Sequence, residues 1–289
     1  MAEKPPPPAL STVPLEPGLY VVATPIGNLR DITLRALDVL AGADLILAED
    51  TRVTGKLLAA YGLSKPLERY DEHAAQRARP KVLVALAEGR RVALVSDAGT
   101  PLISDPGYRL VREVIEQGQK VIPIPGASAS LAALCVAGLP TDRFLFAGFP
   151  PHKAQARRAF YTELAAQRAS LVFYEGASRL GASLADMAAA FGPREAVVAR
   201  ELTKLYETVT RGTLDVLAAN PALASPKGEV VIVVAPSALE AATADDADAA
   251  LIEALGRVGP AEAASEVAGA LGLPRRDLYR RALELKGAR

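Results

Sequence analysis

Short apolar runs alternate with longer segments of helical spacing through the first half of the chain. The runs lie at residues 19–23, 44–48, 92–95 and 121–124. Between the first two, apolar residues recur at helical spacing from Leu34 to Ala41, and Asp31 is the expected N-cap. A further helix is expected over 108–117, with Gly118 at its end. Continuous apolar strands separated by helices predict a parallel sheet buried between helices, and hence an α/β fold.

The second half of the chain places its strands closer together. Strands are expected within residues 144–146, 171–174, 196–199, 207–210 and 230–234. The segment 207–212 is typical of one arm of a hairpin, so this second sheet is expected to be mixed. The change in pattern near 134–142 divides the chain into an N-terminal α/β domain over 18–135 and a second α/β domain over 136–236.

Three segments lie outside these two domains. Residues 1–17 include a run of prolines and are expected to form a disordered, Pro-rich tail. Residues 237–250 are rich in Ala and Asp and are expected to form a linker. Residues 251–289 fit two short helices joined by a turn, which is the pattern of a helix-turn-helix motif with a basic second helix. A small packing appendage with a solvated face has the same pattern, and we favour that interpretation for this segment taken alone.

The composition is that of a globular protein and narrows the chemistry. Half of the 289 residues are apolar, and 33 Lys and Arg balance 33 Asp and Glu, so no overall charge indicates a nucleic-acid partner. Cys135 is the one cysteine and there are two histidines, so the sequence contains no His/Cys cluster that would predict a metal site. The start of the chain resembles no secretory signal, and no segment is long and apolar enough to span a bilayer, which favours a cytoplasmic protein with no membrane partner.

Three loops rich in small residues each follow a predicted strand. Their sequences are ATPIGNL from residue 23, SDAGTP from residue 96 and PGASAS from residue 125. Each loop alone is also what an ordinary turn or helix cap would show. None of them matches the glycine-rich dinucleotide motif or the P-loop. Because the strand ends of a parallel sheet share one edge, the three loops are expected to converge on a ligand at that edge.

Several strings at these loops resemble one known family. In chain order they read ATPIGNLRDIT, AEDTR, LVSDAGTPLISDPGY, GLPTDRF and ARELTK. On these strings the chain is similar to the tetrapyrrole-methylase superfamily, and within it to the branch that methylates the ribose 2′-hydroxyl of cytidine in small-subunit (16S) ribosomal RNA. The resemblance spans nearly all of residues 18–236, and the C-terminal appendage fits the same branch. A histidine often follows AEDTR in that family, whereas this chain has Val53.

The resemblance implies a class III methyltransferase architecture, with two α/β domains, S-adenosylmethionine bound in the cleft between them, and a homodimer. Its substrate would be 16S ribosomal RNA within the small ribosomal subunit. The cofactor would be held by residues of the three loops and of the second domain. By position these are Pro25, Asp97, Ala98, Gly99, Ile103, Ser128, Ala129, Tyr174, Glu175 and Leu202.

Methyl transfer to a ribose hydroxyl needs an oxygen held in line with the methyl group and benefits from a nearby base. By residue type, the candidates for that base are Glu49, Asp50, His73, Asp105 and Glu201, and the sequence does not choose among them. The basic side chains that suit RNA phosphates are Arg30, Arg52, Lys153 and Lys204. The polar groups at 49–52, 69–73 and 200–204 would otherwise be surface charge networks of little energetic weight.

The sequence leaves three other functions open. A tetrapyrrole C-methyltransferase would share the fold and the cofactor, and an amino-group or protein-side-chain methylase is a more distant alternative. A non-catalytic nucleic-acid-binding protein could use the C-terminal helices alone. The strings of the RNA branch favour a ribosomal RNA methyltransferase over all three. Binding of S-adenosylmethionine, measured by calorimetry, separates the enzymes from the non-catalytic protein.

Overall fold

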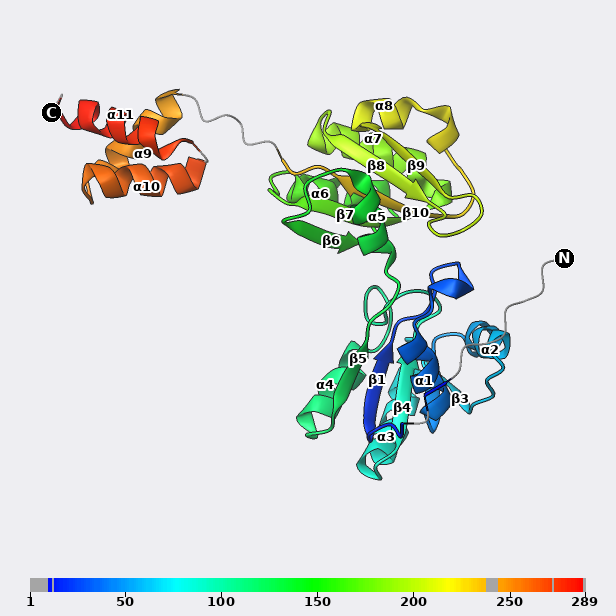
Figure 1. Cartoon of the computed structure of the whole chain (residues 1–289). Helices are drawn as coiled ribbons and strands as arrows, with labels where there is room; N and C mark the ends of the chain where they lie inside the picture. Colours follow the sequence, from blue (N-terminus) through cyan, green and yellow to red (C-terminus); the bar gives the residue numbers. More distant parts are fainter. Residues whose placement is uncertain (1–9, 12, 238–243, 272, 288–289) are drawn as a thin grey trace.

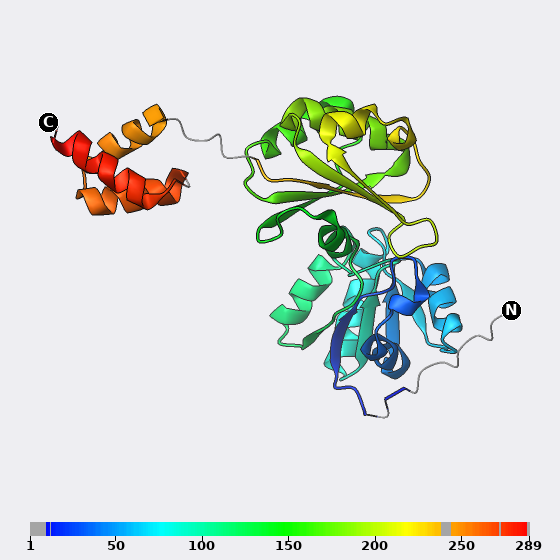
Figure 2. The same ribbon diagram turned by 45° about the horizontal axis from the view of Figure 1, so that its top comes forward.

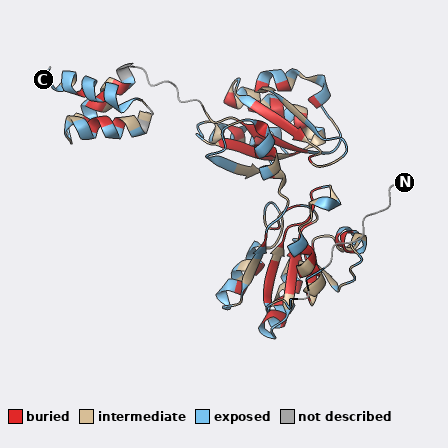
Figure 3. Cartoon of the chain, in the orientation of Figure 1, coloured by how far each residue is buried: buried red, intermediate tan, exposed pale blue. Residues whose placement is uncertain are grey.

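The computed structural model describes residues 10–11, 13–237, 244–271 and 273–287. Two α/β units follow one another along the chain, and a helical unit lies beyond them (Figure 1). In both α/β units the buried residues concentrate in the strands of a central sheet (Figure 3). No helix among the described residues is long and apolar enough to cross a membrane.

The first unit is a parallel sheet of five strands in the order β3-β2-β4-β1-β5. Its strands are β1 (Gly18–Val22), β2 (Leu45–Ala48), β3 (Leu67–Arg69), β4 (Arg91–Val95) and β5 (Val121–Ile124). Its helices are η1 (Leu29–Asp31, 3-10), α1 (Leu34–Gly42), α2 (Thr51–Ala60), α3 (Ala75–Ala87) and α4 (Tyr108–Glu116). Residues of α1 and α2 pack on one face of the sheet, and residues of α3 and α4 pack on the other. The parallel sheet expected from the apolar runs is confirmed.

The start of α1 differs from the expectation. Asp31 lies in the 3-10 turn η1, and Thr33 is the N-cap of α1, because its hydroxyl accepts a hydrogen bond of 3.1 Å from the Ala36 backbone N–H. The expectation that Asp31 caps this helix was therefore wrong. Ile32 and Thr33 have extended backbones, so the N-cap of the helix lies two residues later than expected. The end of α4 is as expected, with Gly118 at φ +70° just beyond it.

The second unit is a mixed sheet in the order β6-β7-β10-β8-β9. Its strands are β6 (Phe144–Gly148), β7 (Ser170–Gly176), β8 (Glu195–Arg200), β9 (Thr208–Thr213) and β10 (Glu229–Val234). Strands β6 and β7 are parallel and the other pairings are antiparallel, including the β8–β9 hairpin, so the expected mixed sheet is confirmed. One face is covered by α6 (Ala154–Leu164), α7 (Leu180–Phe191) and α8 (Leu214–Ala219). The 3-10 turn η2 (Ala177–Arg179) directly precedes α7, and η3 (Pro221–Leu223) follows α8.

The other face of the second sheet is covered by α5 (Ala129–Ala137). Ala133, Leu134 and Ala137 of this helix pack against Val172 and Val197 of the second sheet. By its contacts α5 therefore belongs with the second unit, although its residues fall mostly within the range 18–135 expected for the first. The small side chains of α5 allow this close approach, and they give no sign in the sequence of which sheet they face.

The C-terminal helices α9 (Ala244–Leu255), α10 (Pro260–Leu271) and α11 (Arg275–Gly287) share a core of their own. The expected pair of helices is thus joined by a third, α9, which begins inside the range 237–250 expected as a linker. Ala is the strongest helix former and Asp is favoured near a helix start, so the Ala- and Asp-rich composition suits a first helical turn equally well. Residues 238–243 of the expected linker lie outside the described residues.

The segment just before β1 is attached to the first unit. Leu15 packs against its core, and the Lys120 ammonium pairs with the Glu16 carboxylate at 2.5 Å. This part of the expected tail, over 13–17, is therefore ordered by contacts. The four prolines at 5–8 fall among residues 1–9, which with residue 12 lie outside the described residues.

Candidate functional site

The three small-residue loops meet at the carboxyl ends of β1, β4 and β5. Thr24 and Gly99 exchange backbone hydrogen bonds of 2.9 and 3.0 Å, which joins the first loop to the second. The Thr100 hydroxyl donates to the Ala127 carbonyl at 3.2 Å, which joins the second loop to the third. Gly99 has φ +84°, a conformation that glycine adopts without strain. The expected convergence of the loops is therefore present.

A cavity of about 390 Å³ lies between these loops and the second sheet. This volume is in the range of small-molecule sites in proteins. Its first-domain wall comes from the loops and its second-domain wall from the ends of β6, β7, β8 and β10. Every residue expected to bind the cofactor lines it except Pro25: Asp97, Ala98, Gly99, Ile103, Ser128, Ala129, Tyr174, Glu175 and Leu202. Pro25 lines a second, neighbouring cavity.

Three carboxylates line the first cavity from the side of the parallel sheet: Glu49, Asp97 and Asp105. Burial first, and then the negative charge of Glu49, raise the pKa of Asp105; a hydrogen bond from Ser96 opposes them and the charge of Asp97 adds to them, so that the pKa is about 6. Burial, and then the charge of Asp97, also raise the pKa of Glu49. Within the described residues, none of the three carboxylates forms an ion pair with Lys or Arg. The cavity therefore offers a negative wall without a protein countercharge.

The other candidates for a base lie elsewhere. The Asp50 carboxylate caps α2 and pairs with Arg52, which holds its pKa well below the usual range. His73 is exposed and lines neither cavity. Glu201 lines neither cavity either, and hydrogen bonds from the Glu229 backbone and then from Lys204 lower its pKa. Of the five candidates, the structure brings only Glu49 and Asp105 to the cavity.

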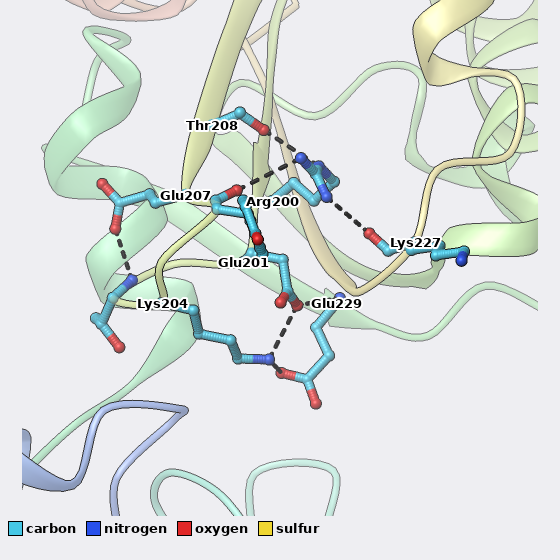
Figure 4. Close-up of polar contacts among 9 residues, drawn as sticks. Arg200, Glu201, Lys204, Glu207, Thr208, Lys227 and Glu229 are labelled. Atoms are coloured by element: carbon cyan, nitrogen blue, oxygen red, sulfur yellow. Dashed lines mark hydrogen bonds and ion pairs between the residues drawn. The ribbon is translucent and has the colours of Figure 1, made fainter.

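The loop between β8 and β9 reaches from the second unit to the first (Figure 2). Lys204 in this loop donates to Glu201 at 2.9 Å and to Glu229 at 3.0 Å (Figure 4). Burial disfavours its charged form, but the two carboxylates outweigh that effect and raise its pKa. The Arg200 guanidinium fixes the base of the loop through the Lys227 carbonyl at 2.9 Å (Figure 4). Lys204 is thus a fixed cation at the boundary of the two units.

The other basic residues expected at RNA phosphates lie on the surface. Arg30 and Lys153 are exposed, and Arg52 is 86% exposed beside Asp50. None of the three lines either cavity, whereas Lys204 lines the second one. The structure therefore brings only Lys204, among these four, to the cavities.

Glu175 is held by protein partners on both of its oxygens. Its side chain is fully buried, pairs with Arg179 and accepts a hydrogen bond from Ser183. It also accepts a bond of 2.8 Å from the Gly176 backbone N–H. Arg179 in turn donates to the Pro150 carbonyl at 3.3 Å, which attaches the loop after β6 to the end of β7. Glu175 therefore fixes a cavity wall, in addition to lining it.

Sequence reasoning indicated Tyr174 and Glu175 in the second-domain wall but missed Phe149 and Glu229. Phe149, 57% exposed, stands edge-on to Tyr174 with their ring centroids 5.4 Å apart, and both line the cavity. Glu229 at the start of β10 lines both cavities. Phe149 follows β6 in a Gly-Phe-Pro turn, and Glu229 follows Lys227-Gly228. These turns at strand ends are the signal that could have indicated them.

The sequence matches two family models. Residues 18–218 match the model of tetrapyrrole (corrin/porphyrin) methylases. Residues 240–286 match the model described as the RsmI C-terminal HTH domain. The first match spans the first α/β unit and the second as far as α8, and the second match spans the helical unit.

Curated relatives match nearly the whole chain. A ribosomal RNA small subunit methyltransferase I from Mesorhizobium japonicum is 52% identical over 94% of this chain and 94% of its own. Proteins of the same name from Erythrobacter litoralis and Escherichia coli O157:H7 are 54% and 44% identical, and cover 96% and 93% of this chain and 98% and 96% of their own.

Solved structures share the fold at low sequence identity. Uroporphyrin-III-C-methyltransferase from Thermus thermophilus has a TM-score of 0.53 at 22% identity, over 74% of this chain and 93% of its own. Diphthine synthase has a TM-score of 0.56 at 18% identity, over 75% of this chain and 89% of its own. These similarities confirm the expected two-domain class III architecture.

Proposed function

The chain belongs to the tetrapyrrole (corrin/porphyrin) methylase family, and on that premise we propose that it transfers a methyl group from S-adenosylmethionine to the ribose 2′-hydroxyl of a cytidine in 16S ribosomal RNA. One observation carries the choice of substrate: the relatives named for ribosomal RNA methylation align over more than nine-tenths of both chains. The tetrapyrrole and diphthine enzymes share only the fold, at 22% identity or less.

The first cavity suits a cationic cofactor. S-adenosylmethionine, when bound, supplies an electrophilic methyl group on a positively charged sulfur and also carries an ammonium group. The three carboxylates on the side of the parallel sheet, Glu49, Asp97 and Asp105, have no Lys or Arg partner within the described residues, so they are available for such charges. The turn at Ala98 and Gly99 is free of large side chains, and Ile26 and Leu202 offer apolar surface. In this proposal Asp97 and the small residues of the loops hold the cofactor.

Asp105 is the residue best suited to accept the proton of the 2′-hydroxyl. A general base works best when its pKa lies near the working pH, and that of Asp105 is raised to about 6. Asp50 and Glu201 have lowered pKa values and lie outside the cavity, so they are poorer bases. We assign Glu49 the part of raising the basicity of Asp105 through its negative charge.

The C-terminal unit is proposed to hold the RNA. Arg275 and Arg276 at the start of α11 are exposed and make no ion pair among the described residues. Unpaired guanidinium groups on one helix end are suited to phosphates. In this proposal the protein acts as a homodimer in the cytoplasm on the small ribosomal subunit.

The experiment uses the purified protein, methyl-labelled S-adenosylmethionine and small ribosomal subunits from cells that lack the gene. After digestion of the RNA to nucleosides, mass spectrometry should find the label in 2′-O-methylcytidine. An Asp97→Asn variant is the matched control and should incorporate little label. Label on a tetrapyrrole, with none on the RNA of the subunits, would reject the proposal.

A further inference from the structure

A second cavity of about 390 Å³ lies beside the first, and most of its lining residues do not line the first. It is built from the Pro25–Gly27 turn, from α2 and from the loop that holds Lys204. The two cavities share Ile26, Asp97, Ala98 and Glu229 as lining residues. A ligand in the second cavity would therefore stand next to a ligand in the first, separated only by the shared wall.

The lining of the second cavity combines apolar surface with two lysines and with the carboxylates of Asp97 and Glu229, of which Glu229 pairs with Lys204. Pro25, Leu29 and Val53 offer apolar surface, and Val53 is 39% exposed at the cavity mouth. Lys204 from the second unit and Lys56 from α2 also line it. Lys56 is exposed and makes no ion pair within the described part of the chain. Flat apolar surface suits a nucleobase, and lysine ammonium groups suit phosphates.

We propose that this second cavity receives the acceptor nucleotide, with its base against the apolar surface at Val53 and its flanking phosphate at Lys56. The inference rests on the proposed function and adds a location for the substrate. A nucleotide held there presents its sugar to the shared wall at Asp97, where the first cavity begins. The target must leave its helix or lie in a single strand to enter, as enzymes that act on a base also require.

The test fills the cavity without touching the first one. Val53→Phe places a ring at the mouth, on an exposed helix position that accepts a larger side chain. We expect the KM for small subunits to rise by about tenfold or more, the scale of one lost base contact, with unchanged affinity for S-adenosylmethionine in calorimetry. Val84→Phe, which adds the same ring at an exposed position of α3 that lines neither cavity, is the matched control and should behave as wild type.

A second variant tests the charge. Lys56→Ala should raise the KM for subunits and reduce its dependence on salt, because one phosphate contact is lost. Lys120→Ala is the control, since Lys120 lies at the amino end of β5 beside Glu16, at the opposite edge of the sheet. Equal effects of the two lysine variants would indicate general attraction and overturn the subsite.

The outcomes separate this inference from the proposed function. Wild-type protein that methylates no cytidine in the subunit overturns both. Wild-type activity that Val53→Phe leaves unchanged overturns the subsite alone. Loss of S-adenosylmethionine affinity in Val53→Phe would assign the second cavity to the cofactor and would also overturn the subsite.

Discussion

The side chain of Lys204 lies across Gly27, so that a Cβ atom on Gly27 would stand 2.6 Å from Lys204 Cγ. Gly27 belongs to the first loop of the parallel sheet, and Lys204 belongs to the β8–β9 loop of the second unit. Gly27 also has φ +144°, a backbone angle that residues other than glycine rarely adopt. A close contact between the two units therefore depends on the absence of a side chain at Gly27.

Gly27→Ala should reduce methylation more than it reduces stability. The added methyl group displaces Lys204 from the second cavity, and the strained backbone costs roughly 1–3 kcal/mol. We expect a lower kcat/KM for small subunits and a modest loss in urea unfolding. Gly62→Ala is the control, because Gly62 has φ +70° with nothing within 4 Å of its Cβ position. It should lose stability and retain activity; equal losses of activity in both variants would argue against the contact.

Asp105→Asn should remove the acidic limb of the pH–rate profile. Because the pKa of Asp105 is about 6, kcat/KM of the wild type should fall as the pH drops below 6 and the carboxylate is protonated. The variant should lose about 10²–10⁴-fold in kcat, the usual contribution of a general base. A profile measured from pH 5 to 8 checks this. An unchanged acidic limb in Asp105→Asn would assign the base to another group.

Glu49→Gln should shift that same limb to lower pH. The negative charge of Glu49 is the largest influence on Asp105 after burial, and it raises the pKa of Asp105. Removing that charge makes Asp105 a stronger acid, so kcat/KM should begin to fall only at a lower pH than in the wild type. The maximal rate should decline, because the Asp105 carboxylate is then a weaker base. Glu72→Gln, on the exposed surface, is the control and should leave the profile in place.

Asp105→Asn should also stabilise the folded protein at neutral pH. Because the pKa of Asp105 is raised in the folded state, the folded protein binds this proton more tightly than the unfolded chain does. The free energy of unfolding therefore falls as the pH rises from about 4 to about 6, and it stays lower above that range. An amide avoids this cost. After allowance for solvent screening of a half-buried group, the gain at pH 8 should be about 1 kcal/mol in urea unfolding. It should disappear below about pH 3, where the wild-type carboxyl is protonated in both the folded and the unfolded state.

The loops of the site could be predicted from sequence, whereas the direction of their side chains could not. Small residues after apolar runs indicated the edge of the sheet at which a ligand would bind, because the carboxyl ends of parallel strands lie at the same edge. Whether Glu49 or Asp50 faces the cavity depends on one residue of register at the start of α2, where Asp50 became the cap. Pro25 lines only the second cavity, whereas the next residue, Ile26, lines both. The assignment of α5 to the second sheet depends on packing between units, which local pattern does not encode.

The buried pair of Glu175 and Arg179 should govern stability and, through it, the shape of the cofactor cavity. Arg179→Met leaves the fully buried Glu175 carboxylate without its cation, which typically costs about 3–5 kcal/mol. It also frees the Pro150 carbonyl, so that the loop bearing Phe149 loses its attachment to β7. We expect a lower Tm and weaker binding of S-adenosylmethionine. The double variant Glu175→Gln with Arg179→Met removes both charges and should recover most of the stability. Its affinity for S-adenosylmethionine should stay low, because the Pro150 attachment is still missing. Full recovery of affinity in the double variant would show that the unpaired charge alone caused the defect, and that Arg179 has no part in positioning the Phe149 wall.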